Sequence, residues 1–404
     1  MENKNIKVID SIMGSGKTFH AIKKLKQTNE NYIYITPYLS EIERLLEKEG
    51  LYNLGYREPL HLGDGKLDNL HELLAQENGI ITTHALFRMS NQETADLIKD
   101  GKYNIIIDES MDVFDIFEIT NKDYEMLIDH DTIILEDDLV VWNDDEYIGK
   151  FNFLKRICEN GDVYFVGKEL NNVLFSWTFD INVMMSFKSI TIMTYLFEAQ
   201  LMYYYFLLNG IDEFDKYYVE KNELKEFTSY QYPNIEHLID IYDGDMNDIG
   251  DRHNALSVNW FNNNKALSTK LQKHIYNYIR NIVNTKSKDI IWTTFKSQYS
   301  KLKGKGYTTS FVSLNARATN EYADRNTVVY CANRYISPNY TIFLKKHDIE
   351  FNQELFALSE LVQFIWRSQI RNKEPINIYI PSSRMRKLLQ DWVMGQITSN
   401  YSSS

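Results

Sequence analysis

Residues 11–18 have the types and spacing that bind a phosphate group. They read Ser-Ile-Met-Gly-Ser-Gly-Lys-Thr, after an apolar run at 6–10 and before a helical pattern that extends to residue 27. Glycine adopts positive φ without steric cost, so backbone N–H groups can converge on an anion, and the helix N-terminus adds the positive end of a dipole. In such a loop Lys17 binds the β- and γ-phosphates and Thr18 is a ligand of Mg²⁺. The residues expected to hold ATP are Met13, Gly14, Ser15, Gly16, Lys17 and Thr18.

One residue departs from the usual form of this loop. Ser11 stands where the motif has its first glycine. The alternative interpretation is a Gly-Ser turn that only opens a helix. The strand before the loop and the helix after it favour the phosphate-binding interpretation.

Two carboxylates at the end of a second apolar run could complete the chemistry. Residues 105–109 read Ile-Ile-Ile-Asp-Glu. Ligands of parallel sheets bind at the carboxyl ends of the strands. Asp108 is therefore expected to hold Mg²⁺, through water, and Glu109 to orient or deprotonate the attacking water. The alternative is a solvated strand end, and the preceding phosphate loop makes the catalytic interpretation the stronger one.

The elements that must position these residues alternate between strands and helices. Unbroken apolar runs such as 103–108 are typical of buried parallel strands, and alternation of strand and helix predicts an α/β fold with a parallel sheet. The predicted strands of the first domain are 6–10, 31–36, 79–83, 103–108 and 188–195. Those of a second α/β pattern are 256–260, 289–294, 309–314, 327–330 and 376–380, with helices at 266–284 and 353–371.

The same pattern predicts the domain organisation. Residues 1–208 are expected to form the first domain, with a small, mainly β and acidic insertion at 112–186. Residues 209–252 are acidic and rich in turns, and we expect a hinge there. Residues 253–404 are expected to form the second domain. A chain of 404 residues exceeds the usual size of one domain, which agrees with this division.

Composition excludes several classes of protein. The hydrophobic fraction of 44% is ordinary for a globular chain, and two cysteines are too few for a disulfide framework or a thiolate zinc site. No apolar run reaches the roughly 18 residues of a membrane helix, and the N-terminus lacks the apolar region of a signal peptide. We therefore expect no membrane association and a cytoplasmic location, in the host cytoplasm for a phage-encoded chain.

The net charge of −12 averages two unlike parts. Residues 1–250 sum to −24 and residues 251–404 to +12, and residues 101–150 alone contain 15 acidic and 3 basic side chains. A basic C-terminal part permits binding to nucleic acid, which the whole-chain charge disfavours. We expect residues 255–404 to contact nucleic acid and salt to weaken this binding. We expect the acidic insertion to face away from the nucleic-acid strand or toward a protein partner.

Eight short motifs give the chain a resemblance to a known family. They lie at 11–18, 34–37, 81–84, 108–112, 191–195, 291–295, 315–321 and 363–371. Their order resembles the superfamily 2 helicases and translocases (DEAD/DEAH-like), nearest to the compact helicase-like proteins of bacteriophages. The resemblance covers residues 5–392 except the insertion. Ser110 and Met111 depart from the DEAH box, and the match at 191–195 is by position rather than by letters.

The resemblance implies two RecA-like domains around one ATP and assigns roles to residues. In the last motif, Trp366 replaces a glycine and Arg371 lies one place late. Residues four apart share a helix face, so Gln363, Arg367 and Arg371 are expected to reach the γ-phosphate together, the alternative being a solvated helix face. The implied catalytic residues are Lys17, Asp108, Glu109, Gln363, Arg367 and Arg371. The implied nucleic-acid contacts are Thr36, Pro37, Thr83, Thr294, Lys296, Arg317 and Thr319. Further basic candidates are Lys301, Lys303, Lys305, Arg384, Arg386 and Lys387.

The expected function is that of an ATP-dependent helicase or translocase in phage DNA replication, repair or recombination. Its cofactors are ATP and Mg²⁺, its ligand is nucleic acid, with DNA favoured, and a replication or recombination protein is expected to bind the acidic insertion. Two alternatives stay open. One is a terminase-type DNA-packaging ATPase, although residues 255–404 lack the clustered carboxylates of a nuclease. The other is a nucleotide-switched binding module without unwinding activity. The sequence leaves open DNA or RNA, and the polarity of movement.

Overall fold

The computed structural model describes residues 5–62, 65–314 and 321–397. The chain forms two compact units, and each is described by itself. The first unit comprises the residues up to Thr228 together with Ser337–Phe351, and the second comprises Ser229–Ile336 and the residues from Asn352 onward. No helix among the described residues is both long and apolar enough to span a membrane.

The described part of the first unit contains an eight-stranded sheet in the order β13-β12-β1-β11-β5-β2-β4-β3. Every neighbouring pair is parallel except β12 and β13, which form an antiparallel hairpin. The strands are β1 (Ile6–Asp10), β2 (Tyr32–Thr36), β3 (Tyr56–Arg57), β4 (Gly79–Thr83), β5 (Asn104–Asp108), β11 (Ser189–Thr194), β12 (Asp215–Glu220) and β13 (Glu223–Glu226). The α/β fold with a parallel sheet is therefore confirmed.

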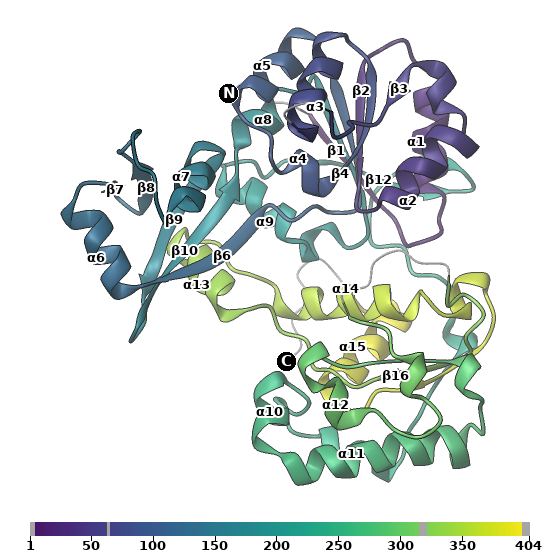
Figure 1. Ribbon diagram of the computed structural model, residues 1–404. Coiled ribbons are helices and arrows are strands. Elements are labelled where there is room, and N and C mark those ends of the chain that lie inside the picture. Colours follow the sequence, from purple (N-terminus) through teal and green to yellow (C-terminus); the bar gives the residue numbers. More distant parts are fainter. Residues whose placement is uncertain (1–4, 63–64, 315–320, 398–404) are drawn as a thin grey trace. The chain divides into compact units, whose positions relative to one another are not determined.

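Helices cover both faces of this sheet (Figure 1). On one face, α1 (Lys17–Gln27) buries Ala21, Ile22 and Leu25 against alternate strand residues such as Tyr34 and Ile106. The short helix α2 (Leu39–Glu43) and a π-helical turn at Arg44–Lys48 extend that layer. Helices α3 (Lys66–Ala75), α5 (Gln92–Asp100) and α8 (Ile181–Met185) lie on the other side of the sheet. Burial on both faces explains why the strands are unbroken apolar runs.

The insertion is a separate antiparallel sheet within the first unit. Its five described strands follow the order β6-β10-β9-β8-β7, and helices α6 (Asn121–Asp129) and α7 (Asn152–Glu159) accompany them. The strands are β6 (Phe114–Thr120), β7 (Ile133–Glu136), β8 (Leu139–Trp142), β9 (Gly161–Lys168) and β10 (Asn172–Phe179). The predicted mainly β insertion is confirmed, and the partly exposed Phe117 stacks on the buried Phe175, with ring centroids 5.5 Å apart.

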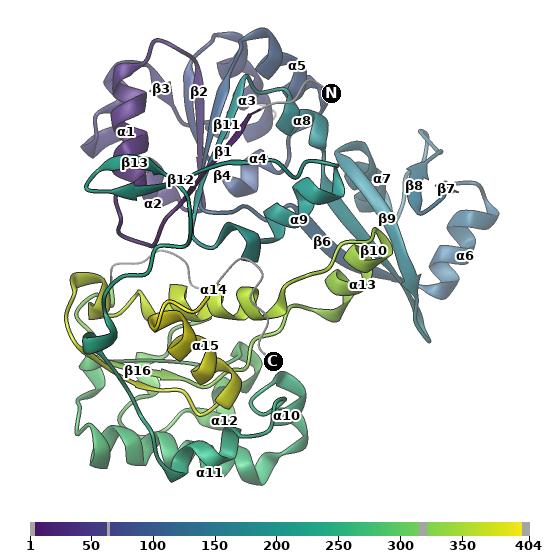
Figure 2. The same ribbon diagram turned by 180° about the vertical axis from the view of Figure 1, so that it is seen from behind.

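One helix from the C-terminal half of the chain belongs to the first unit. Helix α13 (Pro338–Lys346) lies beside β9 and β10 in both views (Figures 1 and 2). The Phe343 ring packs edge-on against Phe114, and its centroid is 5.4 Å from that of the Tyr164 ring. Lys346 forms an ion pair with Asp138. Residues 337–351, which lie in the predicted second domain, are thus part of the unit that contains the insertion.

Among its described residues, the second unit contains a four-stranded sheet in the order β14-β17-β16-β15, and every neighbouring pair of strands is parallel. The strands are β14 (Ile239–Ile241), β15 (Ile290–Thr293), β16 (Thr327–Tyr330) and β17 (Ile376–Tyr379). The helices are α10 (Val258–Asn263), α11 (Lys265–Asn277), α12 (Tyr299–Leu302), α14 (Gln353–Ile365) and α15 (Ser383–Val393). Helices α10 to α12 lie on one side of this sheet and α14 and α15 on the other (Figure 1).

Three sequence predictions about the second unit were wrong. The strand predicted at 256–260 is a turn followed by α10, because the Ser257 hydroxyl accepts the Trp260 N–H and starts a helix. The strand predicted at 309–314 is a short 3₁₀ turn, and only Phe311 bridges to Trp292. The helix predicted over 353–371 ends at Ile365. The predicted hinge, 209–252, contains β12 and β13 of the first sheet and β14 of the second.

Candidate functional site

The glycine-rich loop connects β1 to α1 at the carboxyl edge of the first sheet. Gly14 and Gly16 have φ of 79° and 100°, in the left-handed region that favours glycine, and Gly16 is the N-cap of α1. Lys17 is the first residue of the helix and is 7% exposed. Its ammonium donates to the backbone carbonyl oxygens of Ser11 and Ile12, the latter at 3.2 Å. The loop therefore curls around the lysine head group, with Thr18 half-buried beside it.

Ser11 has a structural role that a glycine could not fill. Its hydroxyl accepts the backbone N–H of Val219 in β12 at 2.7 Å, and its own N–H donates to Thr194 at the end of β11 at 2.9 Å. Ser11 is 3% exposed, so both bonds lie away from solvent. The residue that departs from the motif thus joins the loop to the strands on either side of β1.

Asp10, the last residue of β1, is a buried acid next to the loop. Its two carboxylate oxygens accept the N–H groups of Leu196 and Phe197, each at 2.8 Å. Burial, with the nearby negative charge of Glu198, raises the pKa of Asp10 to about 7. The carboxylate therefore fixes the turn after β11, where Leu196 adopts a positive φ of 54°.

The predicted acidic pair lies at the same edge of the sheet, two strands from β1. Asp108 ends β5, is 9% exposed, and accepts a 2.6 Å hydrogen bond from the Tyr34 hydroxyl. Burial and the adjacent charge of Glu109 raise the pKa of Asp108 to about 7. Glu109 has a φ of 63°, a backbone conformation that is uncommon for residues other than glycine. Its N–H donates to the backbone carbonyl oxygen of Met193. The turn after β5 is therefore fixed by β11.

The structure brings the lysine and the acidic pair into one electrostatic environment. Burial lowers the pKa of Lys17, while the negative charges of Glu109 and Asp108 act in the opposite direction. Of the loop's own polar groups, the Ser15 hydroxyl is buried with no hydrogen-bond partner among the described residues. An ammonium group, an unpartnered hydroxyl and two carboxylates at one sheet edge form a set that can hold a charged phosphate ester and a divalent cation.

The threonines assigned to nucleic acid in the first unit lie at this edge but are not free at the surface. Thr36 ends β2 and is 1% exposed, and Pro37 follows it half-buried. The Thr83 hydroxyl accepts the Leu86 N–H and caps helix α4 (His84–Phe87). Their contacts with nucleic acid stay predictions.

The second unit separates residues that the sequence placed on one helix face. Helix α14 ends at Ile365 because the Ser368 hydroxyl and N–H both bond to the Ile365 carbonyl, at 2.7 and 3.0 Å. Gln363 is inside the helix and donates to the Ser359 hydroxyl, whereas Arg371 lies in a 3₁₀ turn at Gln369–Asn372. The expected single face of 363, 367 and 371 is therefore wrong. Burial lowers the pKa of Arg371.

Arg367 is held by the segment that comes before the motif predicted at 315–321. It is 6% exposed, and its guanidinium donates to the carbonyl oxygens of Ser313 and Leu314, both at 3.3 Å. Arg317 and Thr319, three and five residues after Leu314 in the sequence, lie outside the described residues. Thr294 is fully buried with an unpartnered hydroxyl among the described residues, and Lys296 is exposed.

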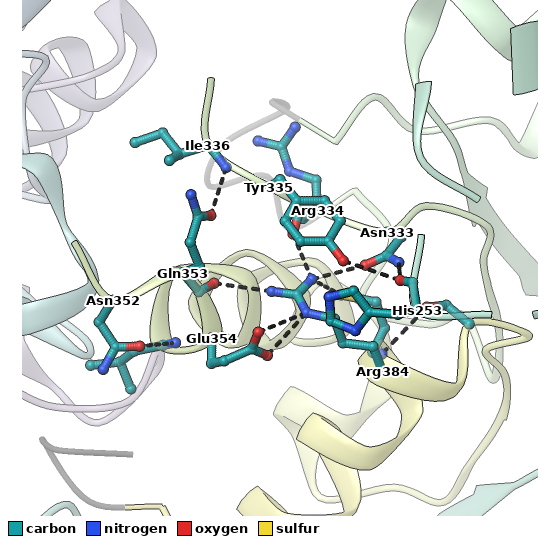
Figure 3. Close-up of polar contacts among 12 residues, drawn as sticks. His253, Asn333, Arg334, Tyr335, Ile336, Asn352, Gln353, Glu354 and Arg384 are labelled. Atoms are coloured by element: carbon teal, nitrogen blue, oxygen red, sulfur yellow. Dashed lines mark hydrogen bonds and ion pairs between the residues drawn. The ribbon is translucent and has the colours of Figure 1, made fainter. Parts of the chain in front are cut away.

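Arg384, a candidate nucleic-acid contact by sequence, is instead the centre of a buried network (Figure 3). It is 6% exposed, and its Nε donates to both carboxylate oxygens of Glu354, at 2.9 and 3.0 Å. A second nitrogen donates to Asn333 Oδ1 and to the Arg334 carbonyl, each at 2.8 Å. The guanidinium also lies over the ring of Tyr335, 4.2 Å from its centroid. Arg384 therefore joins α14, α15 and the loop after β16 and does not face a ligand.

Sequence reasoning missed two groups that touch the predicted site. Tyr34 bonds to Asp108 across β2 and β5, and its place in the middle of an apolar run was the available signal. The hairpin β12–β13 was assigned to the hinge, although the run Tyr217-Tyr218-Val219 has the aromatic and β-branched residues typical of a strand. Neither could be assigned to the loop without knowledge of the strand order.

Comparison with known proteins identifies the family. Two family models match: the YonV middle domain over residues 114–177, and the YonV C-terminal Rossmann-like domain over residues 233–393. The first match coincides with the inserted antiparallel sheet. The second spans most of the second unit and also residues 337–351, which belong to the first unit.

A curated relative matches almost the whole chain. The SPbeta prophage-derived uncharacterized protein YonV of Bacillus subtilis (strain 168) is 43% identical over 413 residues, which span 97% of this chain and 99% of the relative. The chain therefore belongs to the YonV family. Among solved structures, Xpd4 of S. tokodaii aligns with 96% of this chain and 94% of its own, with 13% identity and a TM-score of 0.48.

Proposed function

We propose that this protein is an ATP-dependent helicase or translocase that moves on nucleic acid, with DNA as the favoured ligand. One observation supports ATP hydrolysis, and the order of the eight sequence motifs supports movement on nucleic acid. Lys17, in a loop with two left-handed glycines, shares its electrostatic environment with Asp108 and Glu109 at the carboxyl edge of a parallel sheet. That combination serves phosphoryl transfer, in which catalysis consists of positioning and of stabilising negative charge.

The residues present fit ATP and Mg²⁺. A side chain at Gly14 would meet nothing within 4 Å, and the buried Ser15 hydroxyl has no partner among the described residues, so the loop offers open space and a polar group to an anion. Thr18 and Asp108 would hold Mg²⁺, which supplies neutralisation of the phosphate charge. Burial, and after it the charge of Glu109, raises the pKa of Asp108, and a cation would offset the charge repulsion between the two carboxylates.

The roles of the chain's own residues follow from their contacts. Lys17 would exchange its bonds to the Ser11 and Ile12 carbonyls for bonds to phosphate oxygens. Glu109, fixed by its backbone bond to β11, would orient a water and accept its proton. Arg367 and Arg371 are proposed to stabilise the charge of the transferred phosphoryl group, and Gln363 to assist them. Residues 315–321 and Lys296 are proposed to bind the nucleic-acid backbone.

The test is ATP hydrolysis by the full chain, alone and with single-stranded DNA, duplex DNA and RNA. Lys17→Ala should lower the hydrolysis rate by about 100-fold or more, the usual cost of a lost charge-stabilising donor. Lys26→Ala is the matched control, since Lys26 lies on the same helix with its side chain 40% exposed, and it should leave the rate unchanged. Hydrolysis by Lys17→Ala at the wild-type rate would refute the proposal.

A second function is favoured by one observation. Because α14 ends before Arg367, the glutamine and the two arginines of the last motif do not share a helix face. Without that shared face, ATP hydrolysis would not be coupled to movement along a nucleic-acid strand. The protein would then act as a nucleotide-switched binding module. Strong stimulation of hydrolysis by nucleic acid supports the motor, and hydrolysis that is indifferent to nucleic acid supports the switch.

A further inference from the structure

The hairpin β12–β13 extends beyond the end of β1 and reaches the phosphate loop. Strand β12 pairs with β1 up to Ile9 and Tyr217, and its last residues continue past the strand end. Two residues, Lys221 and Asn222, form the turn, with φ of 49° and 65°. Positive φ at both positions is the mark of a tight two-residue hairpin turn whose twist matches the strands. These two residues therefore form the tip of the hairpin, and both are exposed.

Two contacts fix this hairpin against the loop. The first is the 2.7 Å hydrogen bond from the Val219 N–H to the Ser11 hydroxyl, both residues being buried. The second is close packing at Gly16, where a methyl group would lie 3.1 Å from Asn222 Oδ1 and 3.8 Å from Val219 Cγ1. Leu224 of β13 also packs onto the core beneath α1. The carboxamide of Asn222 thus stands beside the residue that precedes Lys17.

The order of the strands determines which end of a bound triphosphate would lie near the hairpin. In the first sheet β12 is on one side of β1, while β11 and then β5 are on the other. Asp108 and Glu109 follow β5, so a γ-phosphate positioned for hydrolysis must point toward that side. The other end of an extended nucleoside triphosphate then points toward β12 and the hairpin tip.

We propose that the hairpin tip is the subsite for the nucleoside end of the triphosphate, with Asn222 as its contact and Ser11 as the residue that positions the hairpin. The inference rests on the proposed function and deepens it. A carboxamide has two donors and an acceptor, so it can bond to ribose hydroxyls or to the edge of a base. The loop binds the phosphates, and the hairpin provides the selectivity for a nucleotide over a bare polyphosphate.

The test compares two ligands, ATP and inorganic tripolyphosphate, by calorimetric titration of the full chain. Asn222→Gly removes the carboxamide and keeps a residue that tolerates positive φ, so the turn is preserved. It should weaken ATP binding by about 5- to 10-fold, the value of one hydrogen bond, and leave tripolyphosphate binding unchanged. Lys225→Ala, an exposed residue of the same hairpin, should change neither. Lys17→Ala should weaken both ligands.

A second measurement tests the attachment without any nucleotide. Ser11→Ala removes the acceptor of the Val219 N–H, and hydrogen exchange of that amide should become at least about 10-fold faster. The same variant should weaken ATP more than tripolyphosphate. Unchanged ATP affinity in Asn222→Gly, or unchanged exchange at Val219 in Ser11→Ala, would overturn this inference alone. Failure of the wild-type chain to bind either ligand would overturn the proposed function, and this inference with it.

Discussion

Replacement of Asp108 by asparagine should make the protein more stable above neutral pH. In the folded chain the pKa of Asp108 is raised from 3.8 to about 7, first by burial and then by the adjacent Glu109. Ionised Asp108 is therefore an unfavourable group in the fold, and Asp108→Asn removes its charge while its amide oxygen can still accept the Tyr34 hydroxyl. A residue that weakens the fold at a candidate catalytic position is expected where function and stability conflict.

The magnitude follows from the size of the shift. Each pKa unit corresponds to about 1.4 kcal/mol, so roughly three units give an upper value of about 4 kcal/mol in the free energy of unfolding at pH 8. Between pH 4 and pH 7 the folded chain keeps a proton that the unfolded chain has lost, so the stability of the wild type decreases as pH rises through this window. The amide does not titrate. The advantage of Asp108→Asn should therefore grow by about 1.4 kcal/mol per pH unit from pH 5 to pH 7 and then level off.

The assay is thermal unfolding of wild type and variant at pH 5, 6, 7 and 8. A gain of about 2 kcal/mol corresponds to a rise of roughly 4 to 8 °C in Tm for a unit of this size. Asp129→Asn, at an exposed position on α6, is the control and should show no pH-dependent difference. Asp10 also titrates near pH 7 but is present in both proteins, so it cancels in the comparison. A difference in Tm that is the same at pH 5 and pH 8 would refute the reasoning.

Two further substitutions test the packing described above. Arg384→Gln should lower the free energy of unfolding in urea by about 3–5 kcal/mol, because it leaves the partly buried carboxylate of Glu354, 15% exposed, without its guanidinium partner. Gln390→Ala, at an exposed position of the same helix, should cost no more than about 0.5 kcal/mol, and an equal cost for both would contradict the assignment of Arg384. Phe343→Ala should cost about 3–5 kcal/mol and make residues 337–351 sensitive to protease, whereas Ile342→Ala, at a half-exposed neighbour, should not.

The parts of the fold that sequence predicted are those whose signal is local. Strands such as β4 and β5 are continuous apolar runs because both of their faces are covered, and their bounds agree with the sequence to within one residue. The β12–β13 hairpin carries no such unbroken apolar run, since its strands are partly exposed and six of their ten residues are charged. Its membership of the first sheet is decided by pairing with β1, about 200 residues earlier in the chain.

Errors at the candidate site had the same origin. Arg384 lies in a basic stretch of sequence, which indicated a surface that meets phosphate. The carboxylate that binds it, Glu354, is 30 residues earlier on another helix, and nothing in the local pattern reveals that pairing. The helix expected through Arg371 had suitable apolar spacing, but the hydroxyl of Ser368 competes for the Ile365 carbonyl and ends it.

Ser11 shows how a departure from a motif can acquire a meaning only in three dimensions. By the motif alone, serine in place of glycine weakens the case for a phosphate loop. In the fold, its hydroxyl accepts a backbone N–H from Val219, a residue 208 positions away. A glycine there would leave that N–H buried without this acceptor, which costs about 1–3 kcal/mol. The serine therefore satisfies a backbone N–H that the hairpin buries beside the loop. In a chain without this hairpin, that N–H would be absent and a serine would have no such bond to make.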